Sequence, residues 1–175
     1  MILKSLFNII GFQLSWWACV LGAGNNYPYA GPIAMALFLL THYYFFSKNI
    51  QEIKLIIIFG LVGTLIDSFI IYTGILNYAW SYQVGFSIAP LWITAMWCGF
   101  SATINHSMNW LKNKWLIAFI LGVVFGPAAY ITGENFGAIS FYSDLTTIVI
   151  VLSLVWGISI PLIYWVNSKL VLSNN

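Results

Sequence analysis

The chain has 175 residues, of which 61% are hydrophobic and only 6% are charged, whereas about 25% of the residues in an ordinary soluble domain are charged. Because so few charges cannot cover a soluble domain of this size, most of the surface must contact lipid. The aromatic content (9 Trp, 10 Tyr and 13 Phe) and the mean hydropathy of +0.91 also exclude a disordered chain, a nucleic-acid-binding protein and a disulfide scaffold.

Six apolar stretches are long enough for membrane-spanning helices, since a hydrocarbon core about 30 Å thick needs roughly 20 apolar residues per helix. The connections between them are short. The sequence therefore predicts an all-α integral membrane protein, a six-transmembrane-helix bundle that forms a single membrane domain over residues 1–175. The expected helices cover residues 5–23, 30–47, 55–76, 88–110, 115–133 and 145–166.

The basic residues indicate how this bundle is oriented. All six are lysines, and with six spans all of them fall on the same side, which the positive-inside rule assigns to the cytoplasm. Both termini are then cytoplasmic. Glu134 and Asp144 fall in a loop on the other side, and aromatic residues collect at both predicted boundaries, Tyr78 among those outside. The lysines are at positions 4, 48, 54, 112, 114 and 169.

The first apolar stretch is expected to remain as a helix. Asn8 and Gln13 interrupt it and no small-residue cleavage site follows, unlike in a secretory signal peptide. Cys19 and Cys98 both lie at membrane depth, where free thiols pack as small hydrophobic residues. We therefore expect no disulfide.

Helix packing is predicted from small residues at helical spacing, because close approach between helices in lipid depends on them. The clearest stripe lies on the fifth stretch, where small residues recur at steps of four or three. Pro127 lies within this stripe, and neighbouring groups must satisfy the carbonyl that it frees. The stripe consists of Ala118, Gly122, Gly126, Ala129 and Gly133.

Asp67 is the only carboxylate inside a predicted span. Placing such a residue near the centre of a membrane helix costs about 2.5–3.5 kcal/mol, so Asp67 should face the bundle and have a partner or a role. By depth, its expected neighbours are Ser101 and the backbone near Pro127, with Asn105 one turn away. The third, fourth and fifth helices should therefore meet at Asp67. A structural carboxyl and a functional one both remain open.

Polar residues within the spans define the candidate site. Helical rise places them in the cytoplasmic half, with Asp67 about 20 Å above the lysine side, so a cavity open toward the cytoplasm or the inner leaflet is expected. Asp67 and His106 are the candidate catalytic residues. The candidate ligand-binding residues are Gln13, Asp67, Trp97, Ser101, Asn105 and His106.

No metal site and no cofactor site is predicted. The two histidines differ from Asp67 by about 10 Å in expected depth, and neither H-x-x-x-H nor E-x-x-H spacing occurs. The phosphate-binding loop G-x-x-x-x-G-K-[ST] and the nucleophile elbow G-x-S-x-G are absent from the sequence as well.

Several short motifs resemble those of an uncharacterised bacterial family of small multi-pass inner-membrane proteins, a domain of unknown function. The resemblance covers nearly the whole chain. It implies a bacterial inner-membrane location and a gene neighbourhood with lipid-tailoring enzymes, such as cyclopropane-synthase-like methyltransferases and flavin oxidases. The motifs are Phe12 to Trp16, Cys19 to Ala23, Gly31-Pro32, Gly63 with Asp67, Gly74 to Tyr78, Ala89 to Trp92 with Trp97, and Gly126 to Tyr130 with Gly133 and Gly137.

Three classes of function follow. The first is a non-catalytic accessory protein that binds a lipid or a similar apolar molecule, with membrane lipids and lipid-modifying enzymes as its partners. The second is a membrane enzyme that acts on this lipid with Asp67 as acid or base and His106 assisting. The third is a small transporter or a substrate-binding transporter subunit, since six helices in a chain of this length are also similar to the vitamin-capturing subunits of energy-coupling transporters.

Overall fold

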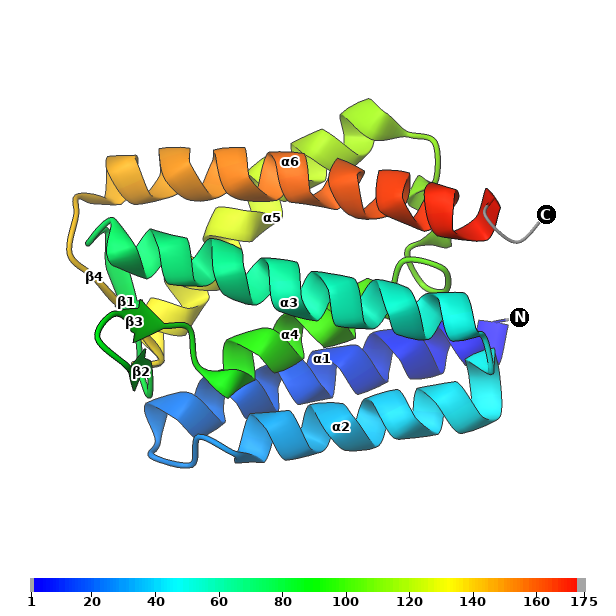
Figure 1. Ribbon diagram of the computed structural model, residues 1–175, viewed down its shortest axis with the longest axis horizontal. Coiled ribbons are helices and arrows are strands. Elements are labelled where there is room, and N and C mark those ends of the chain that lie inside the picture. Colours follow the sequence, from blue (N-terminus) through cyan, green and yellow to red (C-terminus); the bar gives the residue numbers. More distant parts are fainter. Residues whose placement is uncertain (1, 173–175) are drawn as a thin grey trace.

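The computed structural model describes residues 2–172, and six α-helices dominate this part of the chain (Figure 1). A π-helical turn, Tyr43–Ser47, continues the second helix, and a short 3-10 turn, Asn109–Leu111, precedes the fifth. The helices are α1 (Ile2–Gly24), α2 (Ala30–His42), α3 (Ile50–Tyr72), α4 (Leu91–Ser101), α5 (Trp115–Asn135) and α6 (Leu145–Leu172).

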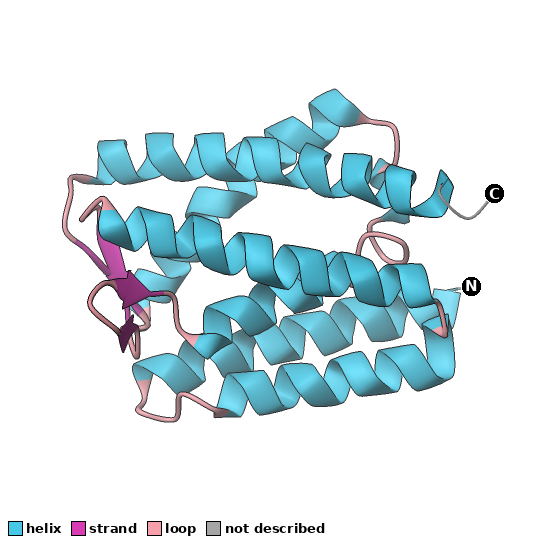
Figure 2. Ribbon diagram, viewed as in Figure 1, coloured by secondary structure: helices cyan, strands magenta, loops and turns pink. Residues whose placement is uncertain are grey.

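Two small antiparallel strand pairs close one end of the bundle, and Figure 2 shows them in magenta. The first pair joins the loop after α3 to the loop before α6. The start of α1 and the end of α6 lie at the opposite end of the bundle (Figure 1). The pairs are β1 (Leu76–Tyr78) with β4 (Ile139–Phe141), and β2 (Tyr82–Gln83) with β3 (Ser87–Ile88).

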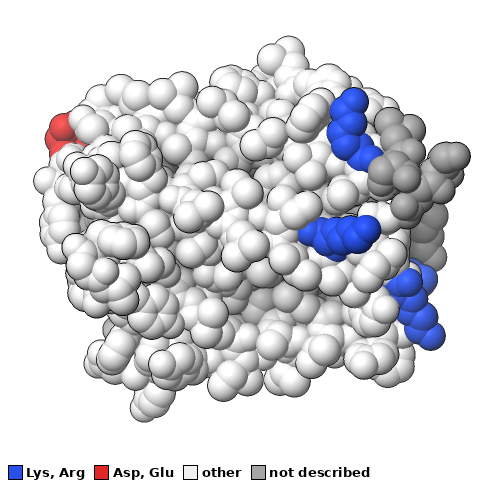
Figure 3. Space-filling view, in the orientation of Figure 1, with Lys and Arg blue, Asp and Glu red and all other residues white. Residues whose placement is uncertain are grey.

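The charged residues divide between the two ends of the bundle. The lysines lie where α1 begins, where α2 passes into α3, where α5 begins and where α6 ends, so they share one end of the bundle. Figure 3 shows lysines gathered at this end, which we call the lysine end, and a small acidic patch at the other. Glu134 and Asp144 are exposed at that other end, the strand end.

Five helical segments in the described part of the chain are long and apolar enough to cross a membrane, so the structure is that of a multi-pass membrane protein. The remaining expected span, the fourth one at residues 88–110, does not form a continuous helix. Its helix α4 has only 11 residues, and residues 102–108 form a series of turns that we call the irregular segment.

Polar contacts with the protein interior stabilise the irregular segment. The Nδ2 of Asn8 on α1 donates to the Ala102 carbonyl at 3.1 Å, and its Oδ1 accepts from the Ser107 hydroxyl at 2.5 Å. Tyr164 on α6 donates its hydroxyl to the Met108 carbonyl at 2.6 Å. Non-helical backbone is tolerated at membrane depth only where protein or water satisfies it, and here side chains do so.

Helix α4 occupies a central position. It packs against α1, α2 and α3. Small residues on α3 and α4 allow this close contact. Gly60 of α3 faces the Cys98 sulfur of α4, and Gly99 of α4 faces Met35 of α2. A side chain at either glycine would collide with its neighbour.

The sequence predicts that the small-residue stripe on α5 packs against another element, and its first two glycines pack against α6. Gly122 faces the backbone of Trp156, and a Cβ added to Gly126 would lie 2.5 Å from the Trp156 Cβ. Such a distance is far inside van der Waals contact, so only glycine fits at this position. The close approach brings Trp156 to the inner face of α5, where it helps to line the candidate site.

Candidate functional site

A cavity of about 360 Å³ lies among α1, α4, α5 and α6. Its walls are largely apolar, with Asp67 of α3 at its inner side and Gln13 of α1 among the few other polar residues. Eight of the side chains that line it are aromatic: Phe12, Trp16, Trp92, Trp97, Phe100, Phe125, Tyr130 and Trp156.

The cavity opens sideways rather than toward either end of the bundle. Helices α1 and α5 form its two walls, and neither packs extensively against the other. Gln13 on α1 and Phe125 on α5 both line the cavity and are both exposed on the surface of the bundle, Phe125 by 63%. In a membrane, this mouth faces lipid.

The cavity lies in the half of the bundle near the strand end, so the prediction of a cavity in the lysine half is wrong. It is lined by the second half of α1, the second half of α5 and Ile139 of β4. The sequence estimate counted depth from Lys54 through a helix over 55–76. In the structure α3 ends at Tyr72, so Asp67 lies only five residues from the strand end of its helix.

Asp67 is completely buried, and three side chains donate hydrogen bonds to its carboxylate. The Tyr130 hydroxyl of α5 and the Trp97 indole N–H of α4 each donate at 2.6 Å, and Tyr78 of β1 donates its hydroxyl to the same oxygen as Tyr130. A carboxylate offers about four acceptor positions, so one position on the Trp97-bound oxygen is left.

This arrangement confirms that Asp67 faces the bundle and that α3, α4 and α5 meet there. The expected neighbours Ser101 and Asn105 are wrong, because the actual donors are aromatic. Tyr130 lies on the small-residue face of α5, four residues after Gly126 and three before Gly133, and this spacing could have indicated it. Tyr78 lies in a loop strand, where no helical periodicity points to it.

Two tryptophans form the inner wall of the cavity beside Asp67. The rings of Trp97 and Trp156 stack with centroids 4.5 Å apart and planes 6° from parallel. Gly63 of α3 allows this arrangement, since a Cβ there would overlap the Trp97 ring. The hydrogen bond to Asp67 and the stack therefore fix the orientation of Trp97 from both sides.

The six predicted ligand-binding residues divide into two groups. Gln13, Asp67 and Trp97 line the cavity, whereas the other three lie outside it. Ser101 donates to the Trp97 carbonyl of its own helix at 2.8 Å. Asn105 exchanges two amide hydrogen bonds with Asn167 of α6, at 3.1 and 2.7 Å, and so attaches the irregular segment to that helix.

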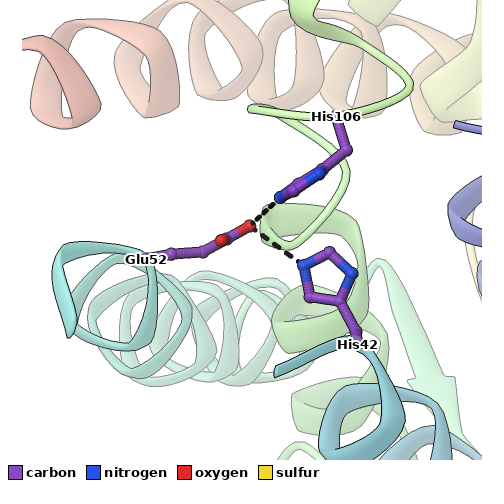
Figure 4. Close-up of side chains that lie close together, drawn as sticks. All are labelled: His42, Glu52 and His106. Atoms are coloured by element: carbon purple, nitrogen blue, oxygen red, sulfur yellow. Dashed lines mark hydrogen bonds and ion pairs between the residues drawn. The ribbon is translucent and has the colours of Figure 1, made fainter. Parts of the chain in front are cut away.

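His106 belongs to a second polar cluster near the lysine end, which Figure 4 shows. Its Nε2 lies 2.9 Å from Oε1 of Glu52, and the Nε2 of His42 lies 3.1 Å from the same oxygen. Ser47 donates its hydroxyl to the other oxygen of Glu52. Since His106 contacts Glu52 rather than Asp67, the two candidate catalytic residues belong to separate sites.

The sequence does not indicate Glu52 as a site residue, because the expected third helix begins at residue 55 and leaves Glu52 in the connection before it. Helix α3 begins earlier than expected: Asn49 caps it, with its side-chain oxygen accepting from the Gln51 amide at 3.0 Å. Asn followed three residues later by Glu before an apolar run is a typical helix start. This signal places Glu52 in the first turn of α3, within reach of α2.

Comparison with known proteins identifies a family. The family described as "Protein of unknown function (DUF2878)" matches residues 5–162. No match is found among curated proteins or among solved structures. The resemblance to an uncharacterised family is thus confirmed, and the chain belongs to the DUF2878 family of proteins of unknown function.

Proposed function

We propose that this membrane protein binds the acyl chain of a lipid, or a similar apolar molecule, in the cavity between α1 and α5. The observation that carries the proposal is the sideways mouth of a cavity with aromatic walls. Small-molecule sites in proteins have volumes of about 300–1,000 Å³, are mostly apolar and contain a few polar groups that orient the ligand. A cavity of about 360 Å³ with Gln13 and Asp67 in its lining fits this description.

Gln13 supports an amphipathic ligand. Its side chain lines the mouth of the cavity, and within the described residues it has no side-chain hydrogen-bond partner. An amide at membrane depth without a partner is costly. A ligand with a carboxyl, hydroxyl or ester group near the mouth would pair with this amide, while its apolar part lies among the aromatic rings.

Asp67 has the geometry of a positioning residue in this proposal. Three aromatic donors surround its carboxylate, and through them it holds Trp97 and Tyr130 in the cavity wall. His106, its proposed assistant in an enzyme, contacts a different carboxylate. These contacts favour a binding protein over an acid–base enzyme.

The proposal includes an arrangement in the membrane. The chain crosses the bilayer six times, with α4 and the irregular segment as the fourth crossing, and both termini are cytoplasmic. The lysines at a single end of the bundle support this orientation. The membrane is the bacterial inner membrane, and the partners of the protein are lipid-modifying enzymes that use the bound molecule.

Native mass spectrometry of the purified protein tests ligand binding. The wild-type chain, extracted in a mild detergent, should carry a co-purifying lipid or fatty acid. Ala129→Phe places a ring in the cavity and should reduce bound ligand at least tenfold. Val124→Phe is the matched control, since Val124 lies on the exposed surface of α5 outside the cavity, and it should retain the ligand. Equal ligand in both variants would refute the proposal.

Lipid analysis of a deletion strain separates the accessory role from the alternatives. The accessory role predicts that a modified lipid is lost on deletion. Expression of the Asp67→Asn variant in the deletion strain should then restore this lipid. Loss of this lipid with Asp67→Asn, in a protein that still accumulates, would instead indicate an enzyme. An unchanged lipid profile with lost uptake of a small molecule would indicate a transporter.

A further inference from the structure

The cluster of His42, Glu52 and His106 lies outside the cavity and has no part in the function proposed above. Three different elements contribute to it: the end of α2, the first turn of α3 and the irregular segment. Both imidazole Nε2 atoms point at the same carboxylate oxygen, at 3.1 and 2.9 Å (Figure 4). One ligand atom from each residue lies within 4.8 Å of the others.

We propose that these three residues form a binding site for a first-row transition-metal dication, with Zn²⁺ as the probe. Two imidazoles and one carboxylate are a donor set that zinc and iron sites use. Zn–N and Zn–O bonds are about 2.0–2.2 Å long, so tetrahedral ligands lie about 3.3 Å apart. The two nitrogen–oxygen distances therefore need to increase by only a few tenths of an ångström.

The surroundings of Glu52 support an ion at this position. Ser47 donates to the second oxygen of Glu52 and leaves the first one directed at the histidines, as outer partners of metal ligands commonly do.

The burial of the three side chains indicates how an ion would enter. The side chains of His42 and Glu52 are 2% and 4% exposed, whereas that of His106 is 15% exposed. An ion would therefore approach past His106, near the lysine end. Three protein ligands would leave the fourth position to water or another small ligand, as in open zinc sites.

This site is not evident from the sequence, in which Asp67 is the carboxylate that stands out within a predicted span. Glu52 lies ten residues after His42 and 54 before His106, so no short motif joins the three. The fold brings them together at the turn from α2 into α3 and by the bend of the chain after α4.

Metal content of the purified full-length protein tests the proposal. After treatment with a chelator and dialysis against Zn²⁺, the wild-type chain should retain about one ion per chain. Glu52→Gln and His106→Asn should each lower the Zn²⁺ affinity at least tenfold. Glu134→Gln is the matched control, because it removes an exposed carboxylate at the strand end and should leave the zinc content unchanged.

Two further measurements keep the outcome decisive. Co²⁺ in the wild-type protein should give the visible absorption of a four-coordinate nitrogen and oxygen site, and Zn²⁺ should raise the melting temperature of the wild type but not of His106→Asn. His106 is the most exposed of the three, so this variant carries the test if Glu52→Gln fails to fold. Absence of Zn²⁺ from the wild type, or equal Zn²⁺ affinity in wild type and His106→Asn, would overturn the proposal.

Discussion

The hydrogen bonds around Asp67 predict a specific effect of removing one hydroxyl group. Tyr130→Phe keeps the aromatic ring, which packs beside Tyr78 and Trp156, and deletes only the donor that lies 2.6 Å from the carboxylate. A buried acceptor that loses a hydrogen-bond donor costs about 1–3 kcal/mol. We therefore expect Tyr130→Phe to lower the free energy of unfolding by about 1–3 kcal/mol.

Titration with SDS in mixed micelles, followed by tryptophan fluorescence, measures this free energy. Tyr72→Phe is the matched control, because the Tyr72 side chain is 78% exposed and contacts Phe69 through its ring alone. Its stability should stay within about 0.5 kcal/mol of the wild type. If Tyr130→Phe is as stable as Tyr72→Phe, the three-donor description of Asp67 is wrong.

A double-mutant cycle isolates the contact itself. Asp67→Asn retains the shape of the side chain and one acceptor oxygen. The double variant with Tyr130→Phe should lose less unfolding free energy than the two single variants lose in sum. Residues in direct hydrogen-bond contact show coupling energies of about 0.5–3 kcal/mol. A coupling energy indistinguishable from zero would mean that Tyr130 and Asp67 do not interact.

Three further predictions concern packing, the irregular segment and topology. Gly126→Leu should lower the melting temperature in detergent more than Gly137→Leu does. The first substitution displaces α6. The second adds a side chain in open space at φ +73°, where left-handed backbone costs about 1–3 kcal/mol. Asn167→Leu breaks the amide pair that attaches the irregular segment to α6 and should lower unfolding free energy by about 1–3 kcal/mol, which SDS titration measures. Cysteines at Lys112 and Asp144 should react with impermeant thiol reagents from opposite sides of the membrane, and labelling of both from one side would contradict the proposed orientation.

Composition and charge predict most of the membrane architecture. Long apolar stretches form helices because every backbone polar group must be satisfied within lipid, and five such helices are present in the described residues. The fourth stretch deviates because Asn8 and Asn167 lie on distant helices and satisfy its backbone and side chains there. No pattern within residues 88–110 shows that such partners exist.

The candidate site was predicted in part. Asp67 was placed in the interior correctly because the cost of a charged group in lipid leaves no other orientation. Its donors were not predicted, since Tyr78 looks like an interfacial tyrosine in the sequence and reaches Asp67 only because β1 pairs with β4. The depth of the cavity was misjudged by extending the third helix beyond Tyr72.

The cluster of His42, Glu52 and His106 could not be predicted from the sequence either. Side-chain convergence depends on where the chain bends, and the bends at Ser47 and in the irregular segment follow from tertiary contacts rather than from local propensity. Glu52 could be assigned to a helix from its capping residue. Its two histidine partners could not be assigned to it without the fold.

Photo-crosslinking in native membranes tests the central claim most directly. The probe is a fatty acid with a diazirine group on its chain, incorporated into membrane lipids. It should label peptides of α1 around Phe12 to Val20 and of α5 around Phe125 to Gly133. Labelling should be strongly reduced in Ala129→Phe and unchanged in Val124→Phe. Uniform labelling of all exposed helix faces, with no difference between these two variants, would contradict a lipid-binding cavity between α1 and α5.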